Sequence, residues 1–183
     1  MTDASSDAAF EAVPLIVQKL GPKQIAFVVR DLETATKQWW DVLRIGPWTA
    51  WEYTPEILKD MTYKGAPAQF GLKHALAWKD GVQFELVEPT TGPSFFADQL
   101  ASSGEGLNHI GIHVTENHAQ AVAELEAAGF VRLQSARGFG GDGSGAFVYF
   151  TSPKLGGLVL ELISPPATRR TPLFVYPPED LKK

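Results

Sequence analysis

The chain contains an internal repeat, and this feature constrains its fold more than any other. Gly81–Pro89 and Gly157–Pro165 share the pattern Gly-x-x-x-Glu-Leu-x-x-Pro, in which glycine opens an apolar run and proline closes it. Upstream of each copy lies a second matched pair of strand-like runs, Gln24–Val29 and His109–Val114. Two copies of one pattern predict two modules with the same topology.

Each module is predicted to contain one helix and four strands. The helices, expected over 32–42 and 119–128, carry apolar residues at spacings of three and four, as burial of one face requires. Further runs of β type fill the gaps between the matched segments: Trp48–Tyr53, Phe70–Trp78, Val131–Ser135 and Ala146–Thr151. The sequence therefore predicts an α+β fold built from two βαβββ modules.

The boundaries of the repeat divide the chain into four parts. We expect an N-terminal extension over 1–20, a first module over 21–92, a second module over 104–166 and a Pro-rich C-terminal tail over 167–183. A length of 183 residues suits one domain of this kind.

Charge and cysteine content exclude several functions. With a net charge of -5 the chain lacks the basic surface that nucleic acid or an anionic membrane requires, so we expect neither as a partner. The sequence has no cysteine, so a metal would be held by His, Asp, Glu or amide oxygens. Residues 1–10 lack the basic start and apolar stretch of a signal peptide, and we expect a cytoplasmic protein.

The four matched strands each carry one prominent polar residue, and alternation along a strand places these residues on the same face. One row of side chains is apolar throughout, as in Ile25 and Phe27, and should lie under the helices. The other row is small or apolar except for a few polar groups, chief among them Gln24, Glu85, His109 and Glu161. Small and apolar residues around convergent polar groups are typical of a partly enclosed site.

These four side chains offer an amide oxygen, two carboxylates and an imidazole, a donor set that suits a divalent cation. Burial of two carboxylates without a counter-charge is costly, and a metal ion would remove that cost. The alternative is that each glutamate lies at a sheet margin, solvated or paired with Lys or Arg, and that His109 is a hydrogen-bonded core residue.

With these residues in place, the sequence resembles the vicinal oxygen chelate superfamily, which includes glyoxalase I, methylmalonyl-CoA epimerase, bleomycin resistance proteins and extradiol dioxygenases. The resemblance covers about 23–165 and is carried by four stretches: Gln24–Glu33, Phe84–Pro89, Gly104–Ile112 and Leu160–Ile163. It implies that the two modules form an eight-stranded, U-shaped half-barrel with the helices outside. It also implies one metal ion on the concave face, and a homodimer.

Carried over by position, the implied metal ligands are again Gln24, Glu85, His109 and Glu161. The order Gln, Glu, His, Glu is similar to zinc-type glyoxalase I, and the implied metals are Zn, Ni, Co or Mn. By the same resemblance Glu161 and Glu85 would be catalytic, moving a proton next to a metal-bound enediolate or enolate of a substrate with two adjacent oxygens.

Five other residues are candidates for the substrate pocket. If Asp80 and Gly81 form a two-residue turn, His74 and Trp78 share the face of Glu85. His113 shares the alternation of His109 but lies four residues along, so we expect it to line the cavity rather than bind the ion. Trp48 and Trp51 belong to an aromatic strand that could line the substrate wall or form core and dimer contacts.

The leading hypothesis is thus a metal-dependent isomerase, epimerase or lyase acting on a small molecule. One alternative is a metal-free binding protein that sequesters a drug or metabolite in the same cavity. Another is an Fe(II)-dependent ring-cleaving dioxygenase, in which His74 or His113 would have to replace Gln24 as a ligand.

Overall fold

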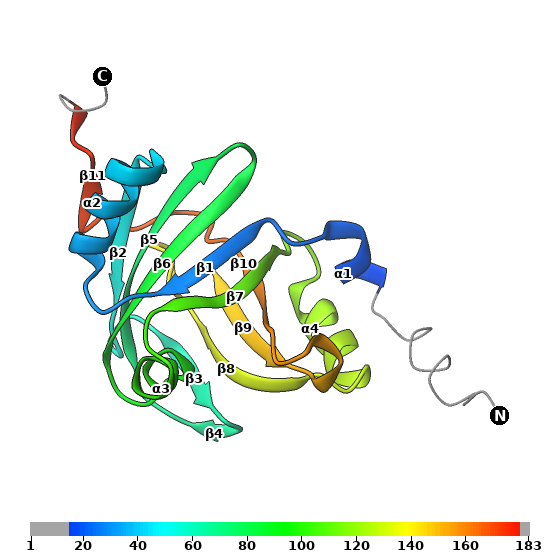
Figure 1. The fold of residues 1–183 in the computed structure, drawn as a ribbon. Coiled ribbons are helices and arrows are strands. Elements are labelled where there is room, and N and C mark those ends of the chain that lie inside the picture. Colours follow the sequence, from blue (N-terminus) through cyan, green and yellow to red (C-terminus); the bar gives the residue numbers. More distant parts are fainter. Residues whose placement is uncertain (1–14, 180–183) are drawn as a thin grey trace.

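One strongly curved sheet forms a half-barrel around a central cavity, with the helix of each repeated module on its outer face. The computed structural model describes residues 15–179 (Figure 1). The sheet has the strand order β11-β2-β5-β6-β1-β7-β10-β9-β8-β3-β4. Its central pair, β1 and β7, is antiparallel and joins the two halves of the molecule within one chain.

The two halves share one topology, with a parallel first and last strand in each. The elements of the first half are β1 (Gln24–Val28), α2 (Leu32–Leu43), β2 (Trp48–Tyr53), β5 (Gly71–Lys79) and β6 (Val82–Thr91). Those of the second half are β7 (Gly106–His113), α4 (His118–Ala127), β8 (Val131–Arg137), β9 (Ala146–Thr151) and β10 (Val159–Ser164). These elements coincide closely with the predicted ones, and the α+β half-barrel is confirmed.

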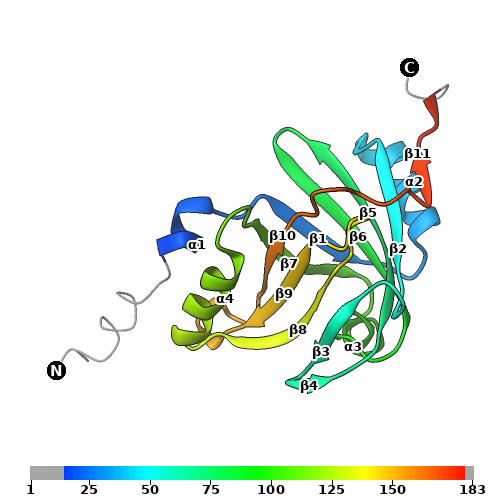
Figure 2. The ribbon, with the colours of Figure 1, turned by 180° about the vertical axis from the view of Figure 1, so that it is seen from behind.

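The sheet has eleven strands rather than the eight expected. The insertion between β2 and β5 forms β3 (Lys59–Tyr63) and β4 (Ala66–Pro67), and β3 pairs with β8 of the other half. The C-terminal tail forms β11 (Phe174–Tyr176), which pairs with β2 (Figure 2). Each half is therefore extended at its outer edge by a segment from elsewhere in the chain. Pairing of this kind satisfies the backbone groups that β2 and β8 would otherwise expose.

Three short helical segments lie outside the repeat or within its loops. Helix α1 (Leu15–Leu20) packs its Ile16 and Val17 against the second half, and residues 1–14 of the expected extension lie outside the described residues. Helix α3 (Phe95–Ser102) begins at Ser94, whose side chain accepts a hydrogen bond from Ala97 N. A 3₁₀ turn, η1, spans Pro153–Leu155. Among the described residues, no helix is long and apolar enough to cross a membrane.

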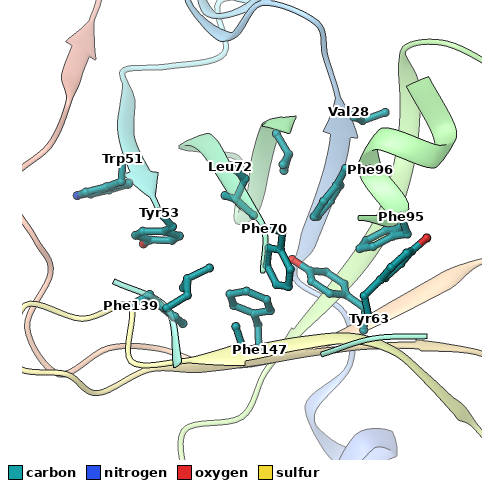
Figure 3. Close-up of a cluster of buried hydrophobic side chains, with 14 residues drawn as sticks. Val28, Trp51, Tyr53, Tyr63, Phe70, Leu72, Phe95, Phe96, Phe139 and Phe147 are labelled. Atoms are coloured by element: carbon teal, nitrogen blue, oxygen red, sulfur yellow. The ribbon is translucent and has the colours of Figure 1, made fainter. Parts of the chain in front are cut away.

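The apolar side chains form three cores. One packs α2 on the convex face of the first half, around Leu32, Trp48 and Leu86. A second packs α4 on the second half, around Leu125 and Leu162. The third lies inside the half-barrel and is strongly aromatic, with side chains from both halves and from α3 converging (Figure 3).

The alternation predicted from the sequence holds in all four central strands. Phe27 contacts Trp39 of α2 on the helix side, whereas its neighbour Val28 belongs to the inner core. Asp80 and Gly81 both have positive φ and form the two-residue turn, so that Lys79 pairs with Val82. This register brings His74 to the same face as Glu85.

Candidate metal and acid–base site

The central four strands place the predicted ligands in two adjacent rows on the concave face. Glu85 and His109 both lie opposite Ala26 of β1, one on each side. Gln24 and Glu161 both lie opposite Gly111 of β7. The small residue in the middle of each row leaves room for the longer side chains to meet above the sheet.

Three of the predicted ligands converge at one buried point. One donor atom each from Glu85, His109 and Glu161 lie within 4.8 Å of one another. His109 Nε2 is 3.1 Å from Glu161 Oε2 and 3.3 Å from Glu85 Oε2. His109 is fully buried, and the two glutamates are almost so. In the described part of the chain, no Lys or Arg pairs with either carboxylate.

A chain of hydrogen bonds fixes the ring of His109 from behind. Its Nδ1 lies 2.7 Å from Asn108 Oδ1, and Asn108 Nδ2 donates to Gln99 Oε1 of helix α3 at 2.9 Å. Because an amide oxygen accepts, His109 carries a proton on Nδ1, and Nε2 is directed at the carboxylates. Helix α3, which the sequence did not predict, thus positions the imidazole.

The neighbour of Glu85 is a histidine. Glu85 Oε1 is 2.7 Å from His74 Nδ1 on the adjacent strand β5. Burial has the largest single effect on Glu85 and raises its pKa, but the hydrogen bonds and charges of His109 and His74 outweigh it and lower the pKa to about 2. Glu85 is therefore held as a carboxylate.

The neighbour of Glu161 is a tyrosine. Tyr149 lies directly opposite Glu161 on strand β9, and the two side chains are hydrogen-bonded. Burial raises the pKa of Glu161, and the charge of Glu85 adds to this effect, against the lowering influence of His109. Burial is also the largest effect on His109 and lowers its pKa, but the two glutamates raise it to about 9. The two carboxylates thus occupy chemically different environments.

Gln24 contributes an oxygen without a partner. Its Nε2 donates to Gln83 Oε1 at 3.1 Å, while its buried Oε1 makes no hydrogen bond. A Cβ at position 111 would lie 2.2 Å from that oxygen, so glycine is needed there to accommodate the Gln24 side chain. Glu85 Oε2 is likewise buried, and its one recorded contact is the ion pair with His109 Nε2 at 3.3 Å.

The donor set fits a divalent cation. Two carboxylates and an unpaired amide oxygen line one cavity, and the buried Nε2 of His109 contacts both carboxylates. An unpaired buried oxygen such as Gln24 Oε1 is costly unless a cation or a donor meets it. Ligands of one ion at bond lengths of about 2.0–2.2 Å lie at most roughly 4.4 Å apart. The 4.8 Å spread therefore needs only a small side-chain movement to close.

The site opens into a cavity of ≈ 60 Å³, enough for about four to six water molecules. Its walls combine the site residues with aromatic groups from both halves, Tyr53 and Phe147 among them. The chain after β10 contributes Pro165, Pro166 and Arg169. The C-terminal tail therefore contributes Arg169 to the cavity wall.

The predicted pocket residues divide into two groups. His74 and His113 line the cavity, and His113 Nε2 is 3.1 Å from Gln83 Oε1. The three tryptophans do not line it. Trp48 is fully buried in the core under α2, Trp51 packs behind His74, and Trp78 is half exposed at the rim beside His113. Side chains alternate between the two faces of β2. Trp51 and Tyr53 point to the inner core, so Trp48 points to the opposite face and packs under α2.

Sequence reasoning missed three contributors to the site: Asn108, Tyr149 and Arg169. Tyr149 could have been predicted from the sequence. In a βαβββ module the strand at 146–151 pairs with the next strand, which carries Glu161. Asn108 is adjacent to a predicted ligand, but nothing in the sequence fixes its side-chain partner. Arg169 lies in the tail, whose path over the cavity depends on tertiary structure alone.

Comparison with known proteins places the chain in a family. Residues 23–150 match the family model described as the glyoxalase/bleomycin resistance protein/dioxygenase superfamily. No curated protein matches this chain.

Solved structures share the fold at low sequence identity. Methylmalonyl-CoA epimerase from Mycobacterium tuberculosis is 21% identical, with a TM-score of 0.54, over 79% of this chain and 87% of the other. A variant of the Streptomyces coelicolor epimerase in complex with 2-nitronate-propionyl-CoA is 19% identical (TM-score 0.53, covering 80% and 97%). A hypothetical protein from Bacillus halodurans C-125 is 17% identical (TM-score 0.55, covering 82% and 98%).

Proposed function

From the premise that this chain belongs to the glyoxalase/bleomycin resistance protein/dioxygenase superfamily, we propose that it is a metal-dependent isomerase, epimerase or lyase. Its substrate would be a small molecule with two adjacent oxygens. The observation that carries the proposal is the convergence of Glu85, His109 and Glu161 at one buried point, with no Lys or Arg of the described chain to neutralise the carboxylates.

The ion would be held by Gln24 Oε1, His109 Nε2 and the carboxylates of Glu85 and Glu161. A bound Zn, Ni, Co or Mn ion would supply Lewis acidity toward the neighbouring oxygens of the substrate. Asn108 keeps the proton of His109 on Nδ1, which leaves Nε2 available as a ligand.

The proton would be moved by the two carboxylates. Glu161 takes a proton from the carbon next to a substrate carbonyl through one of its carboxylate oxygens, and Tyr149 holds that carboxylate in place by a hydrogen bond. Return of the proton from Glu161 to the neighbouring carbon gives isomerisation. Epimerisation needs a second proton delivered to the same carbon from the opposite side by Glu85, which must first take up a proton from solvent while Glu161 releases one.

The two alternatives lack comparable support. In a metal-free binding site we expect Lys or Arg beside the two carboxylates, whereas among the described residues their charged neighbours are histidines, His109 and His74. An iron site of the ring-cleaving kind needs two histidines with one carboxylate, whereas the buried group in the described residues holds one histidine and two glutamates.

Isotope exchange tests the proposal even while the product is unidentified. The protein, loaded in turn with Zn, Ni, Co or Mn, is incubated in D₂O with hemithioacetals of 2-oxoaldehydes and with 2-substituted malonyl thioesters. NMR should show loss of the proton next to the carbonyl for at least one compound. Glu161→Gln should abolish the exchange, while Glu116→Gln, an exposed control, should not. Absence of both stoichiometric metal binding and exchange would contradict the proposal.

A further inference from the structure

The C-terminal segment carries a cation to the mouth of the cavity. After β10 the chain runs from the second half to β11 at the edge of the first half (Figure 2). On this path Arg169 lines the cavity that holds Glu85 and Glu161. No part of the predicted site includes this residue.

Arg169 is held in place on both sides along the chain. The carbonyl of Thr168 accepts a hydrogen bond from Gly141 N at 2.8 Å, and that of Arg170 accepts one from Trp51 Nε1 at 2.9 Å. The guanidinium of Arg169 lies over the Trp51 ring, 4.8 Å from its centroid. A guanidinium stacked on an aromatic ring keeps its N–H groups directed outward, where they can bind an anion.

The guanidinium of Arg169 has no acidic partner among the described residues, and its one recorded contact is with the Trp51 ring. The cavity beside it contains two carboxylates, so an anionic ligand would be repelled there without a cation at the entrance.

A second hollow adjoins the cavity at Arg169. Leu76, Gln83 and Arg169 line both spaces, and the outer groove of ≈ 500 Å³ is completed by apolar and aromatic side chains together with Thr49: Pro47, Trp51, Ala77 and Trp78. The inner cavity of ≈ 60 Å³ has room for a reacting group of only about four to six non-hydrogen atoms. The groove shares three lining residues with the cavity, so it offers a continuous path for the remainder of a larger substrate.

We propose that Arg169 binds a carboxylate on the tail of the substrate, and that the flat, apolar part of that tail lies in the groove between Trp51 and Trp78. This inference rests on the proposed function, because it takes the inner cavity to hold the reacting end. One guanidinium balances one negative charge, and it matches a carboxylate with two parallel N–H···O bonds. A phosphate monoester dianion would leave charge uncompensated beside apolar walls.

Binding of a carboxylate probe tests the proposal in the full chain without turnover. Phenylacetate is titrated by calorimetry, alongside its neutral amide, phenylacetamide, and phenyl phosphate. We expect phenylacetate to bind to the wild-type protein at least about tenfold more tightly than the amide, and Arg169→Gln to abolish that difference. Arg169→Lys, which keeps the charge but not the paired N–H groups, should retain part of it.

Control variants separate this site from the catalytic one. Arg132→Gln removes the same charge far from the groove and should leave phenylacetate binding unchanged. Glu161→Gln should abolish isotope exchange yet still bind phenylacetate, so the failure of one proposal is distinguishable from the failure of the other. Equal phenylacetate affinity in wild type and Arg169→Gln would overturn the proposal, as would tighter, Arg169-dependent binding of phenyl phosphate.

Discussion

The two halves of the half-barrel have the same topology but place different side chains beside their glutamates. In the first half, Leu76 of β5 lies opposite Glu85 of β6. The Glu85 carboxylate instead contacts His74, two residues before Leu76 on β5. In the second half, Tyr149 lies directly opposite Glu161. Burial raises the pKa of both carboxyls, but at Glu85 the two histidines outweigh it and lower the pKa to about 2. At Glu161 burial and the charge of Glu85 prevail, and the pKa is raised.

This difference shows how a duplicated backbone can yield an asymmetric site. The repeat places two glutamates symmetrically about one point, and only Glu85 has a second histidine, His74, on the adjacent strand. Pairs of carboxyl groups whose pKa values are driven apart are typical of acid–base sites. The asymmetry gives predictions that can be tested without a known substrate.

The largest expected effect comes from removing either carboxylate. Glu85→Gln and Glu161→Gln should each weaken zinc affinity at least about 100-fold, measured by chelator competition, because each loses an anionic ligand. In the metal-free protein they should differ. Glu85→Gln removes the charged partner of His74 and one of the two carboxylates beside His109, and should cost about 2 kcal/mol of unfolding free energy, whereas Glu161→Gln should cost less. Equal losses of stability would show that the halves are electrostatically equivalent.

Metal affinity should depend strongly on pH. His109 must lose a proton from Nε2 before this nitrogen can coordinate, and its pKa is raised to about 9. Zinc affinity should therefore rise about tenfold per pH unit from pH 7 toward pH 9 and level off above. Calorimetry in buffers of different ionisation enthalpy should detect the released proton. An affinity that is constant from pH 7 to 9 would mean that His109 is neutral in the metal-free protein.

Exchanging the neighbours of the glutamates tests the comparison directly. His74→Phe and Tyr149→Phe each keep a ring but remove a polar contact to a carboxylate. We expect His74→Phe to weaken zinc binding about tenfold, as for other residues that orient a ligand, and Tyr149→Phe to have a smaller effect. If Tyr149→Phe weakened zinc binding more than His74→Phe did, the residue that orients its glutamate more strongly would be the one in the second half.

A glycine-to-alanine change tests Gln24 as a ligand. In Gly111→Ala the new methyl group would displace the Gln24 side chain, so zinc affinity should fall several-fold with little change of the fold. Gly141→Ala is a matched control, because its nearest contact would be 3.4 Å away. If both variants bind zinc like the wild type, Gln24 is not a ligand.

The smallest effect concerns the helix starts of the two halves. Asp31 caps α2 by accepting a hydrogen bond from Thr34 N, whereas Asn117 before α4 has a left-handed backbone and no side-chain cap. Asp31→Ala should lower the melting temperature by a few degrees. Asn117→Gly should leave it unchanged or slightly raised, because glycine adopts positive φ without strain. Equal destabilisation by both would remove this difference between the halves.

Much of the fold and the centre of the site could be predicted from the sequence. The repeat located nearly all the strands of both modules, and alternation along β1, β6, β7 and β10 selected the four polar side chains on the concave face. The Asp80–Gly81 turn fixed the register of β5 and with it the side of His74. All of these are local regularities, since turn geometry and the two-residue period of a strand operate within a few residues.

Only the tertiary structure decided what surrounds that centre. The pairing of β3 with β8 and of β11 with β2, the support of His109 by α3, and the position of Arg169 over Trp51 all join segments far apart in the chain. No periodicity encodes such contacts. Unpaired strand edges and buried polar groups without hydrogen bonds raise the free energy of the folded chain. Contacts with segments distant in the sequence lower it by supplying the missing partners. The sequence determined which groups face inward, and packing between distant segments decided their protonation and the shape of the entrance.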